Sequence, residues 1–341
     1  MTQSDAYSQA GVNIEAGHRA NELMKDAVRS TYGNEVLSET GAFGGLFSAQ
    51  ALKSMDSPVL VASTDGVGTK TMVAAKMGKW DTIGQDLVNH CINDILVQGA
   101  KPLFFLDYVA SSQLVPEQIA DVVRGCAIAC KQSSVALLGG ETAEMPGVYQ
   151  TGEVDLVGTV VGMVDKASIL DGSSVEVGNV IINLPSSGLH TNGYSLARKT
   201  LADFDWQEAR DDLSDESIGD ILLNIHRCYL NDVQKLQSAG IDIRGLAHIT
   251  GGGVVDNLPR ILPDNRRAVI KRDSWAVPPI FSLIQGAGDI AESDMFHAFN
   301  MGLGMLIIVT TEQAQTVLDT LPAFAQIVGE IVDGESGVEL R

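Results

Sequence analysis

Residues 63–70 constrain the fold of this 341-residue chain most strongly, because they join a strand pattern to a helix pattern through closely spaced glycines. They read Ser-Thr-Asp-Gly-Val-Gly-Thr-Lys, after an apolar run at 58–62 and before a helical pattern at 71–79. Glycines permit close backbone approach, a helix N-terminus offers N–H groups, a lysine adds charge and an aspartate holds Mg²⁺. The stretch predicts a polyphosphate-binding loop, with a capped turn as the alternative. It is not a Walker A loop, because only one residue separates its glycines.

Composition narrows the class of protein. The chain has 43 acidic and 23 basic residues, a formal net charge of −20, and a length typical of two domains. A nucleic-acid surface needs a basic face, so no nucleic-acid partner is expected. A phosphorylated substrate is compatible with the charge, because Mg²⁺ and a few local donors reverse the sign within a site.

The N-terminal sequence and the spacing of the cysteines indicate the cellular compartment in which the protein is expected. Residues 1–10 are polar without the pattern of a signal peptide, and no apolar stretch reaches the length of a membrane span. The four cysteines lack zinc-site spacing, and Cys126 and Cys130 are predicted to be buried as small apolar residues. We therefore expect a reduced cytoplasmic protein with no membrane partner.

Residues 81–98 form a strongly amphipathic helix pattern, with apolar residues at helical spacing over one broad face. Asp86, His90 and Asn93 share the opposite face, and Asp94 lies at its edge. Short polar side chains in place of Lys and Glu suit a wall that faces a ligand. A partly desolvated Asp94 would be a favourable metal ligand; the alternative is a solvated face on which Asp94 makes a local cap.

A later strand pattern ends as the first one does, with glycines and a carboxylate after the apolar residues. After a strand at 102–109 and a helix that opens at Pro116, a strand at 135–139 leads to Glu141. Asp65, Asp94 and Glu141 are predicted to converge on Mg²⁺ as oxygen ligands. A strand at 154–164 completes a β-α-β-α-β-β order, an α+β domain with an antiparallel final pair. That strand is apolar on both faces, so its four-stranded sheet is predicted to pair across a dimer.

The domain boundary is placed near residue 170, which gives domains of 1–170 and 171–341. Strands and helices alternate in the second domain, predicting an α/β fold with a mixed sheet. Its strand at 180–184 leads into Pro-Ser-Ser-Gly-Leu-His-Thr-Asn-Gly and a helix, a second junction suited to phosphate. His190 there is a candidate proton carrier or hydrogen-bond donor, and an incidental loop histidine is the alternative.

Three further segments belong to the second domain, and a fourth belongs to the N-terminal arm, residues 1–57. His-Ile-Thr-Gly-Gly-Gly at 248–253 is a third glycine-rich junction, 218–239 is expected to be one helix, and 204–217 is expected to be solvated acidic surface. In the arm, residues 39–47 combine three glycines with Phe43 and Phe47. This composition suits a mobile loop that closes over a ligand, or alternatively a surface loop anchored by its aromatics.

Five segments in this order resemble the phosphoribosylformylglycinamidine cyclo-ligase, or aminoimidazole ribonucleotide synthetase, family. They are residues 65–70, 90–94, 139–147, 186–194 and 248–253, and the similarity runs from 7–11 nearly to the C-terminus. The resemblance implies ATP-dependent closure of the imidazole ring of formylglycinamidine ribonucleotide. It also implies Mg²⁺ and a homodimer whose N-terminal sheets meet in a shared barrel.

With the residues above, the resemblance implies individual roles. The expected metal ligands are Asp65, Asp94 and Glu141. The expected nucleotide-binding residues are Asp65, Gly66, Gly68, Thr69 and Lys70, with Lys25, Gly44 and Gly45 as candidates for closing over the nucleotide. The expected ribonucleotide-binding residues are Ser187, Gly188, His190 and Asn192. Lys70, Asp94 and His190 are expected to act in catalysis, and His90 is given no role.

Two other functions share part of this pattern. A related small-molecule kinase would share residues 65–70 but leave phosphate on an organic product. A non-catalytic ATP-binding homologue would keep the glycines and tolerate loss of the carboxylates, so the three carboxylates disfavour it.

Overall fold

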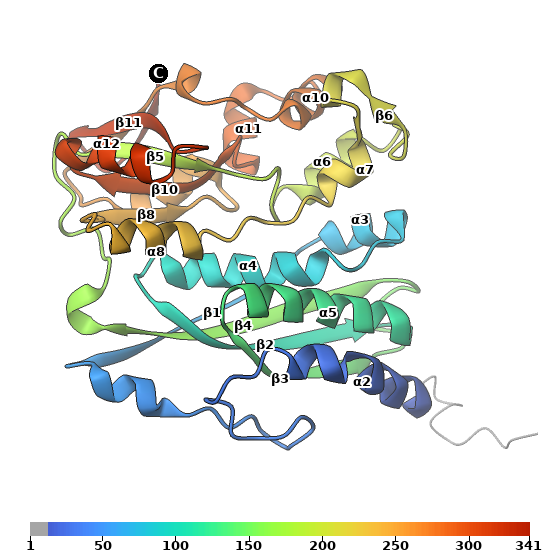
Figure 1. The fold of residues 1–341 in the computed structure, drawn as a ribbon. Coiled ribbons are helices and arrows are strands. Elements are labelled where there is room, and N and C mark those ends of the chain that lie inside the picture. Colours follow the sequence, from blue (N-terminus) through green and yellow to red (C-terminus); the bar gives the residue numbers. More distant parts are fainter. Residues whose placement is uncertain (1–12) are drawn as a thin grey trace, which may run out of the picture. The chain divides into compact units, whose positions relative to one another are not determined.

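A computed structural model describes residues 13–341 and places them in two compact units (Figure 1). The N-terminal unit comprises the described residues up to Ile95 together with Lys101–Lys166, and the C-terminal unit comprises Leu96–Ala100 and Ala167–Arg341. The chain passes into the C-terminal unit after Lys166, and the domains of 1–170 and 171–341 stay a prediction. Residues 7–11, which contribute to the family resemblance, lie outside the described residues. Between residues 13 and 341, no helix has the length and apolar character needed to cross a membrane.

The N-terminal unit is built on a four-stranded sheet in the order β1-β4-β2-β3. Its strands are β1 (Pro58–Gly66), β2 (Lys101–Ser111), β3 (Ala136–Glu144) and β4 (Val154–Asp165). β2 and β3 run parallel, and β4 runs antiparallel to both of its neighbours. The four-stranded α+β prediction is confirmed, but β4 inserts between β1 and β2 and does not pair with β3. Pairing across the sheet depends on packing between distant segments, which the pattern along the chain does not record.

Two helices, α4 (Ile83–Leu96) and α5 (Pro116–Gln132), cover one face of this sheet (Figure 1). They approach closely at Gly84, where an added Cβ would lie 2.0 Å from the carbonyl oxygen of Val122. Cys126 and Cys130 on α5 are buried, as predicted. The helix α2 (Ile14–Arg29) packs beside α5, and α3 (Lys70–Met77) follows β1.

The opposite face of the sheet retains exposed apolar side chains. Leu60 on β1 is 61% exposed and Leu106 on β2 is 37% exposed, beside the half-buried Val157 on β4. Part of this face is covered by the N-terminal arm, since the ring centroid of Phe47 lies 5.3 Å from that of Phe104. The sheet thus has one face closed by helices and one face that is only partly covered.

The C-terminal unit contains a six-stranded sheet that is mixed, as predicted. Its strands, in order across the sheet, are β12 (Gly337–Leu340), β9 (Arg266–Ile270), β11 (Gln326–Asp333), β5 (Val180–Pro185), β10 (Leu303–Val309) and β8 (Gly245–His248). β12 and β9 are parallel, and the other pairs are antiparallel. Every residue of β10 is buried, so this strand lies in the core of the unit. The surrounding helices include α6 (Tyr194–Thr200), α9 (Gly253–Asn257), α10 (Pro279–Gly288), α11 (Glu292–Ala298) and α12 (Thr311–Thr320).

The single helix expected over 218–239 is wrong. The structure has α7 (Ile218–Leu222) and α8 (Leu230–Ser238), separated by residues 223–229. His226 and Tyr229 in this break are fully buried, and the Tyr229 hydroxyl donates to the carbonyl oxygen of Pro185 at 3.0 Å. Burial of these two side chains outweighs helix propensity, which is a weak preference.

The acidic segment 204–217 is not solvated along its whole length. Trp206 and Leu213 are buried, and β6 (Ala209–Arg210) pairs with β7 (Glu216–Ser217). The prediction of solvated surface is therefore wrong for these apolar side chains, which anchor the segment to the unit.

Asp107 on β2 makes the stability of the N-terminal unit depend on pH. Burial raises the pKa of its carboxyl group from 3.8 to about 7. The folded state therefore binds more protons than the unfolded state between these values, and the free energy of unfolding falls as pH rises through this interval. The loss is at most about 4 kcal/mol, and less to the extent that the carboxylate contacts water. Asp107→Asn should remove this dependence, as measured by urea unfolding at several pH values.

The exposed Asp121→Asn is the matched control, since Asp121 forms a surface ion pair with Arg124 on α5. It should unfold with the pH dependence of the wild type. A constant difference between the wild type and Asp107→Asn at all pH values would contradict the prediction.

Candidate active site

Residues 63–70, which run from the end of β1 to the start of α3, contact one face of α4 at three successive helical turns. The Ser63 hydroxyl donates to Asp94 Oδ2 at 3.3 Å. His90 Nε2 lies 3.0 Å from Asp65 Oδ2, and Lys70 Nζ lies 2.8 Å from Asp86 Oδ2. Side chains four residues apart share a helix face, so Asp86, His90 and Asp94 form a row. This row fixes the glycine-rich loop relative to α4.

His90 lies between the two carboxylates that were predicted to bind metal. Its Nε2 is 3.0 Å from Asp65 Oδ2 and 3.6 Å from Asp94 Oδ2, and its ring is buried while both carboxylates are partly exposed. Burial disfavours the charged ring, but the hydrogen bond to Asp65 and the charges of Asp94, Asp65 and Asp86 outweigh it and raise the pKa of His90. The sequence-based prediction gave His90 no role. Its spacing of four residues from both Asp86 and Asp94 nevertheless places it on the same helix face as these two carboxylates.

Asp65 and Asp94 form a suitable oxygen donor set for a hard cation. Both are carboxylates, both reach the surface, and His90 brings them to one place. Asp65 Oδ1 also accepts a hydrogen bond from the Gly66 amide at 2.8 Å, which orients the carboxylate.

Lys70, predicted to bind phosphates, is fully buried and ion-paired with the fully buried Asp86. Burial lowers the pKa of Lys70, and the charge and hydrogen bond of Asp86 oppose that shift in part. The role of Lys70 in phosphate binding stays a prediction. What the structure provides is an ionic link between the first residue of α3 and the first turn of α4.

Asp86→Ala should destabilise the protein by about 3–5 kcal/mol, because it leaves a buried ammonium group without its carboxylate. The free energy of unfolding in urea measures this change. Replacing both partners, as Lys70→Met with Asp86→Leu, should recover much of the loss, since no buried charge remains. A cost of Asp86→Ala below about 1 kcal/mol would show that the pair is not needed to hold these helices.

Glu141 is not brought to Asp65 and Asp94 within one chain. It lies on β3, and two strands separate β3 from β1, a distance of about 14 Å across a sheet. The registers place Asp65 and Gly140 on the helix-covered face, so Glu141 points to the opposite face. The exposed carboxylate of Glu141 accepts from the amide of Thr142 at 2.9 Å. Its role as a metal ligand stays a prediction.

The other predicted nucleotide-binding residues are partly or fully exposed on the N-terminal unit. Gly68 and Thr69 precede α3, with Gly68 at a φ of 53° and Thr69 at the N-cap. Lys25 is exposed on α2, and Gly44 and Gly45 are exposed in the arm. The structure leaves Lys25, Gly44 and Gly45 at the surface, and their roles stay predictions.

In the C-terminal unit, the loop after β5 contains the predicted ribonucleotide-binding residues. The Ser187 hydroxyl donates to the Ile225 carbonyl oxygen at 2.5 Å, and Asn192 Nδ2 donates to the Thr191 hydroxyl at 3.4 Å. The loop ends at Gly193, whose φ is 80° and where an added Cβ would lie 2.3 Å from the Phe299 ring. Glycine is therefore required there to start α6.

His190 is buried in this loop and forms a cluster with His226 and His248. The His190 and His226 rings are stacked, with centroids 3.9 Å apart and an interplanar angle of 17°. His226 Nε2 lies 3.0 Å from His248 Nε2, and His226 Nδ1 lies 3.4 Å from the Thr191 hydroxyl. Among these histidines, the sequence-based prediction gave a role to His190 alone. His248 was noted only as the first residue of the glycine-rich segment 248–253, and the break at 223–229 that supplies His226 was not foreseen.

Two buried asparagines, also missed, hold the glycine-rich loops. Asn300 donates to the Gly188 carbonyl oxygen at 2.9 Å and accepts from the Ser186 hydroxyl at 3.0 Å. Asn257 Nδ2 donates to the Gly251 and Gly253 carbonyl oxygens at 3.1 and 2.8 Å. The sequence signal was weak, since both asparagines lie outside the motifs. Buried backbone carbonyl oxygens need hydrogen-bond donors, and the side-chain amides of Asn257 and Asn300 supply them in these loops.

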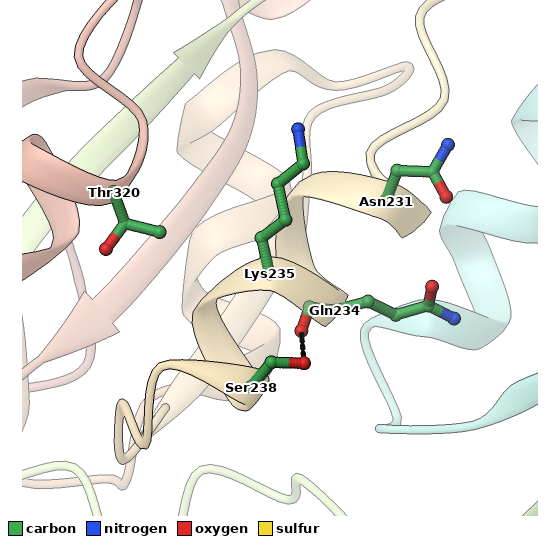
Figure 2. Close-up of a pocket in the computed structure, with 5 residues that line it drawn as sticks. All are labelled: Asn231, Gln234, Lys235, Ser238 and Thr320. Carbon is green, nitrogen blue, oxygen red and sulfur yellow. Dashed lines mark hydrogen bonds between the residues drawn. The ribbon is translucent and has the colours of Figure 1, made fainter.

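A hollow of about 550 Å³ lies elsewhere on the C-terminal unit, beside α8 (Figure 2). It is lined by Asn231, Gln234, Lys235, Ser238 and Thr320. It contains neither a carboxylate nor a histidine, and the Ser238 hydroxyl is bonded to the Gln234 carbonyl oxygen at 2.8 Å. The candidate functional groups are therefore two, each described within its own unit: the residues around His90 in the N-terminal unit and the residues around His190 in the C-terminal unit.

Comparison with known proteins identifies two domain families in this chain. Residues 48–164 match the model of the N-terminal domain of AIR synthase related protein, and residues 176–340 match that of its C-terminal domain. The phosphoribosylformylglycinamidine cyclo-ligase of Alkaliphilus oremlandii is 47% identical over 339 residues, covering 98% of this chain and 99% of the relative. That of Syntrophotalea carbinolica is 49% identical over 343 residues, covering 98% and 97%.

Solved structures share the fold at lower sequence identity. A thiamine-monophosphate kinase from Stenotrophomonas maltophilia aligns with a TM-score of 0.66 at 18% identity, covering 93% of this chain and 95% of that one. The hydrogenase maturation protein HypE in complex with ATP aligns with a TM-score of 0.62 at 16% identity, covering 95% and 90%. These likenesses show the fold of the chain.

Proposed function

This chain belongs to the phosphoribosylformylglycinamidine cyclo-ligase family, and from that membership we propose which of its residues do which part of the work. The enzyme is an ATP-dependent ligase of purine biosynthesis that converts formylglycinamidine ribonucleotide to aminoimidazole ribonucleotide. The observation that supports the assignment is the convergence of Asp65 and Asp94 on His90 beside the glycine-rich loop.

Asp65 and Asp94 would hold Mg²⁺, because they are the partly exposed carboxylates that the fold brings together. When bound, Mg²⁺ supplies positive charge that neutralises the phosphate oxygens of ATP. Gly66, Gly68 and Thr69 permit close approach of the nucleotide, and Lys70 keeps this loop in place through Asp86. His90 orients Asp65 by its hydrogen bond, which makes it a positioning residue.

The reaction divides into two displacements. The formyl oxygen attacks the γ-phosphorus of ATP, the bond to the bridging oxygen breaks and ADP leaves; the formyl amide nitrogen loses its proton, which gives an imino phosphate. The amidine nitrogen then attacks the formyl carbon, the carbon–oxygen bond breaks, phosphate leaves and the attacking nitrogen loses its proton. A proton shift from the ring CH₂ group to the exocyclic imine nitrogen completes the aminoimidazole. Phosphorylation turns a poor leaving group into a good one, so the protein contributes mainly by positioning the reactants and stabilising charge.

The loop of the C-terminal unit would hold the ribonucleotide through Ser187, Gly188, His190 and Asn192. Its support is the dense anchoring of this loop by Asn300 and by the Ile225 carbonyl oxygen. A rigid loop loses little entropy when it binds a ligand, so a prepared site of this kind favours affinity.

A homodimer would cover the open face of the N-terminal sheet. That face carries the exposed Leu60 and Leu106, and apolar surface of this kind is typical of association sites. Glu141 points to the same side of the sheet as Tyr108 and Val157, so a part for Glu141 in metal binding would require a second copy of the chain.

Asp65→Asn and Asp94→Asn should each reduce kcat at least about 100-fold, because each removes a carboxylate from the metal-binding pair. The assay supplies ATP, Mg²⁺ and formylglycinamidine ribonucleotide and measures free phosphate together with aminoimidazole ribonucleotide.

Asp121→Asn makes the same chemical change on the exposed surface of α5 and should leave kcat unchanged. Turnover near the wild-type value in Asp65→Asn or Asp94→Asn at saturating Mg²⁺ would remove that residue from the site. Absence of aminoimidazole ribonucleotide with the wild-type enzyme would reject the activity itself.

Leu106→Lys should shift the protein from dimer to monomer in sedimentation experiments at micromolar concentration, because it places a charge in the apolar face of the proposed interface. Val177→Lys is the control, since Val177 is 52% exposed and lies in the C-terminal unit. A monomeric wild type, or an unchanged dimer in Leu106→Lys, would contradict this interface.

A further inference from the structure

The histidine cluster of the C-terminal unit restricts what His190 can do chemically. The family membership leaves open whether this ring carries a proton during ring closure or only donates a hydrogen bond. The contacts of His190 with Ser187 and His226 decide between these possibilities. The inference rests on the proposed role of His190 in holding the ribonucleotide.

A backbone amide fixes the tautomer of His190. The Ser187 N–H points to His190 Nε2 at 3.1 Å. An amide N–H only donates, so Nε2 must accept with its lone pair and the ring proton must lie on Nδ1. A second proton on Nε2 would oppose the Ser187 N–H and break this bond. The His190 ring is therefore held as a neutral imidazole with Nδ1–H as its donor.

The neighbouring rings also disfavour a charge on His190. His226 stacks on it with centroids 3.9 Å apart, and all three histidines are buried. Burial disfavours the charged form of an imidazole, and a charge on one ring disfavours a charge on the next. The hydrogen bond between His226 Nε2 and His248 Nε2 needs one proton and no charge.

A metal ion held by all three histidines fits the geometry less well. Their ligand atoms lie within 4.8 Å of one another. Two imidazoles on one tetrahedral zinc, with Zn–N bonds of about 2.0–2.1 Å, have centroids about 5 Å apart. The His226–His248 pair, at 5.0 Å, meets this value, whereas the stacked His190–His226 pair, at 3.9 Å, is too close. His190 Nε2 is in addition engaged by Ser187.

We propose that His190 serves ring closure as a neutral hydrogen-bond donor with its proton on Nδ1 and carries no proton during that step. The Ser187 amide and the stacked His226 ring set this role. A donor of fixed direction stabilises the atom that accepts from it as negative charge develops on that atom, and no free energy is lost in reorienting the donor.

A matched pair of substitutions tests the proposal. His190 has a φ of 62°, a left-handed conformation that Asn and Asp tolerate better than other non-glycine residues. His190→Asn keeps a donor near the position of Nδ1, whereas His190→Asp has the same size and only accepts. We expect kcat/KM within about tenfold of the wild type for Asn and a loss of at least about 100-fold for Asp.

Equal losses in the two variants, or higher activity in Asp than in Asn, would overturn the proposal, since a proton carrier is not replaced by an amide. His297→Asn, at an exposed position of α11, is the control and should retain wild-type kcat/KM. Thermal unfolding of each variant shows whether it is folded.

Nitrogen NMR of the wild-type protein with ¹⁵N-labelled histidine gives a readout that needs neither activity nor a folded Asp variant. The His190 signals, assigned by their absence in His190→Asn, should show one protonated and one bare nitrogen from about pH 6 to 8. Two protonated nitrogens at the acid end would overturn the proposal. A wild type that makes no aminoimidazole ribonucleotide would reject the proposed function but leave this NMR result standing.

Discussion

The buried ion pair between Lys70 and Asp86 is the interaction on which the N-terminal site depends. It connects the first residue of α3 to the first turn of α4, and because both side chains are fully buried, a lost partner leaves an uncompensated charge. One and two turns later on the same face, His90 and Asp94 hold Asp65 and Ser63. The positions of the carboxylates thus follow from the fixed spacing of residues on one helix. The glycine-rich loop is held by α4 at both of its ends, so these ends cannot move independently.

The sequence predicted the parts of the site that are local and failed where distant segments meet. The strand, loop and helix around Asp65 and the loop around His190 were foreseen, because glycine spacing and apolar periodicity are properties of neighbouring residues. The break that delivers His226 was not, since its cause is the burial of His226 and Tyr229 against a loop far along the chain. The family resemblance supplied the activity, which periodicity and composition did not contain.

Glu141 illustrates the same limit on a larger scale. From the sequence, Glu141 follows an apolar strand and glycines, as Asp65 follows its own strand, and the two were expected to converge on Mg²⁺ with Asp94. The order β1-β4-β2-β3 instead puts the two residues on opposite edge strands, and the side-chain alternation of the strands turns them to opposite faces. Strand order and register come from side-chain packing between strands, so no single-strand pattern reveals them.

The place of β4 in the sheet also determines when the N-terminal unit can form. Within the described residues, β4 is the neighbour through which β1 joins the sheet, yet it is the last of the four strands in the chain. During synthesis, β1 and one edge of β2 must wait unpaired until Val154–Asp165 has left the ribosome, and unpaired edges attract other strands. The sheet therefore closes late, and the newly made chain needs protection from neighbouring chains until β4 arrives.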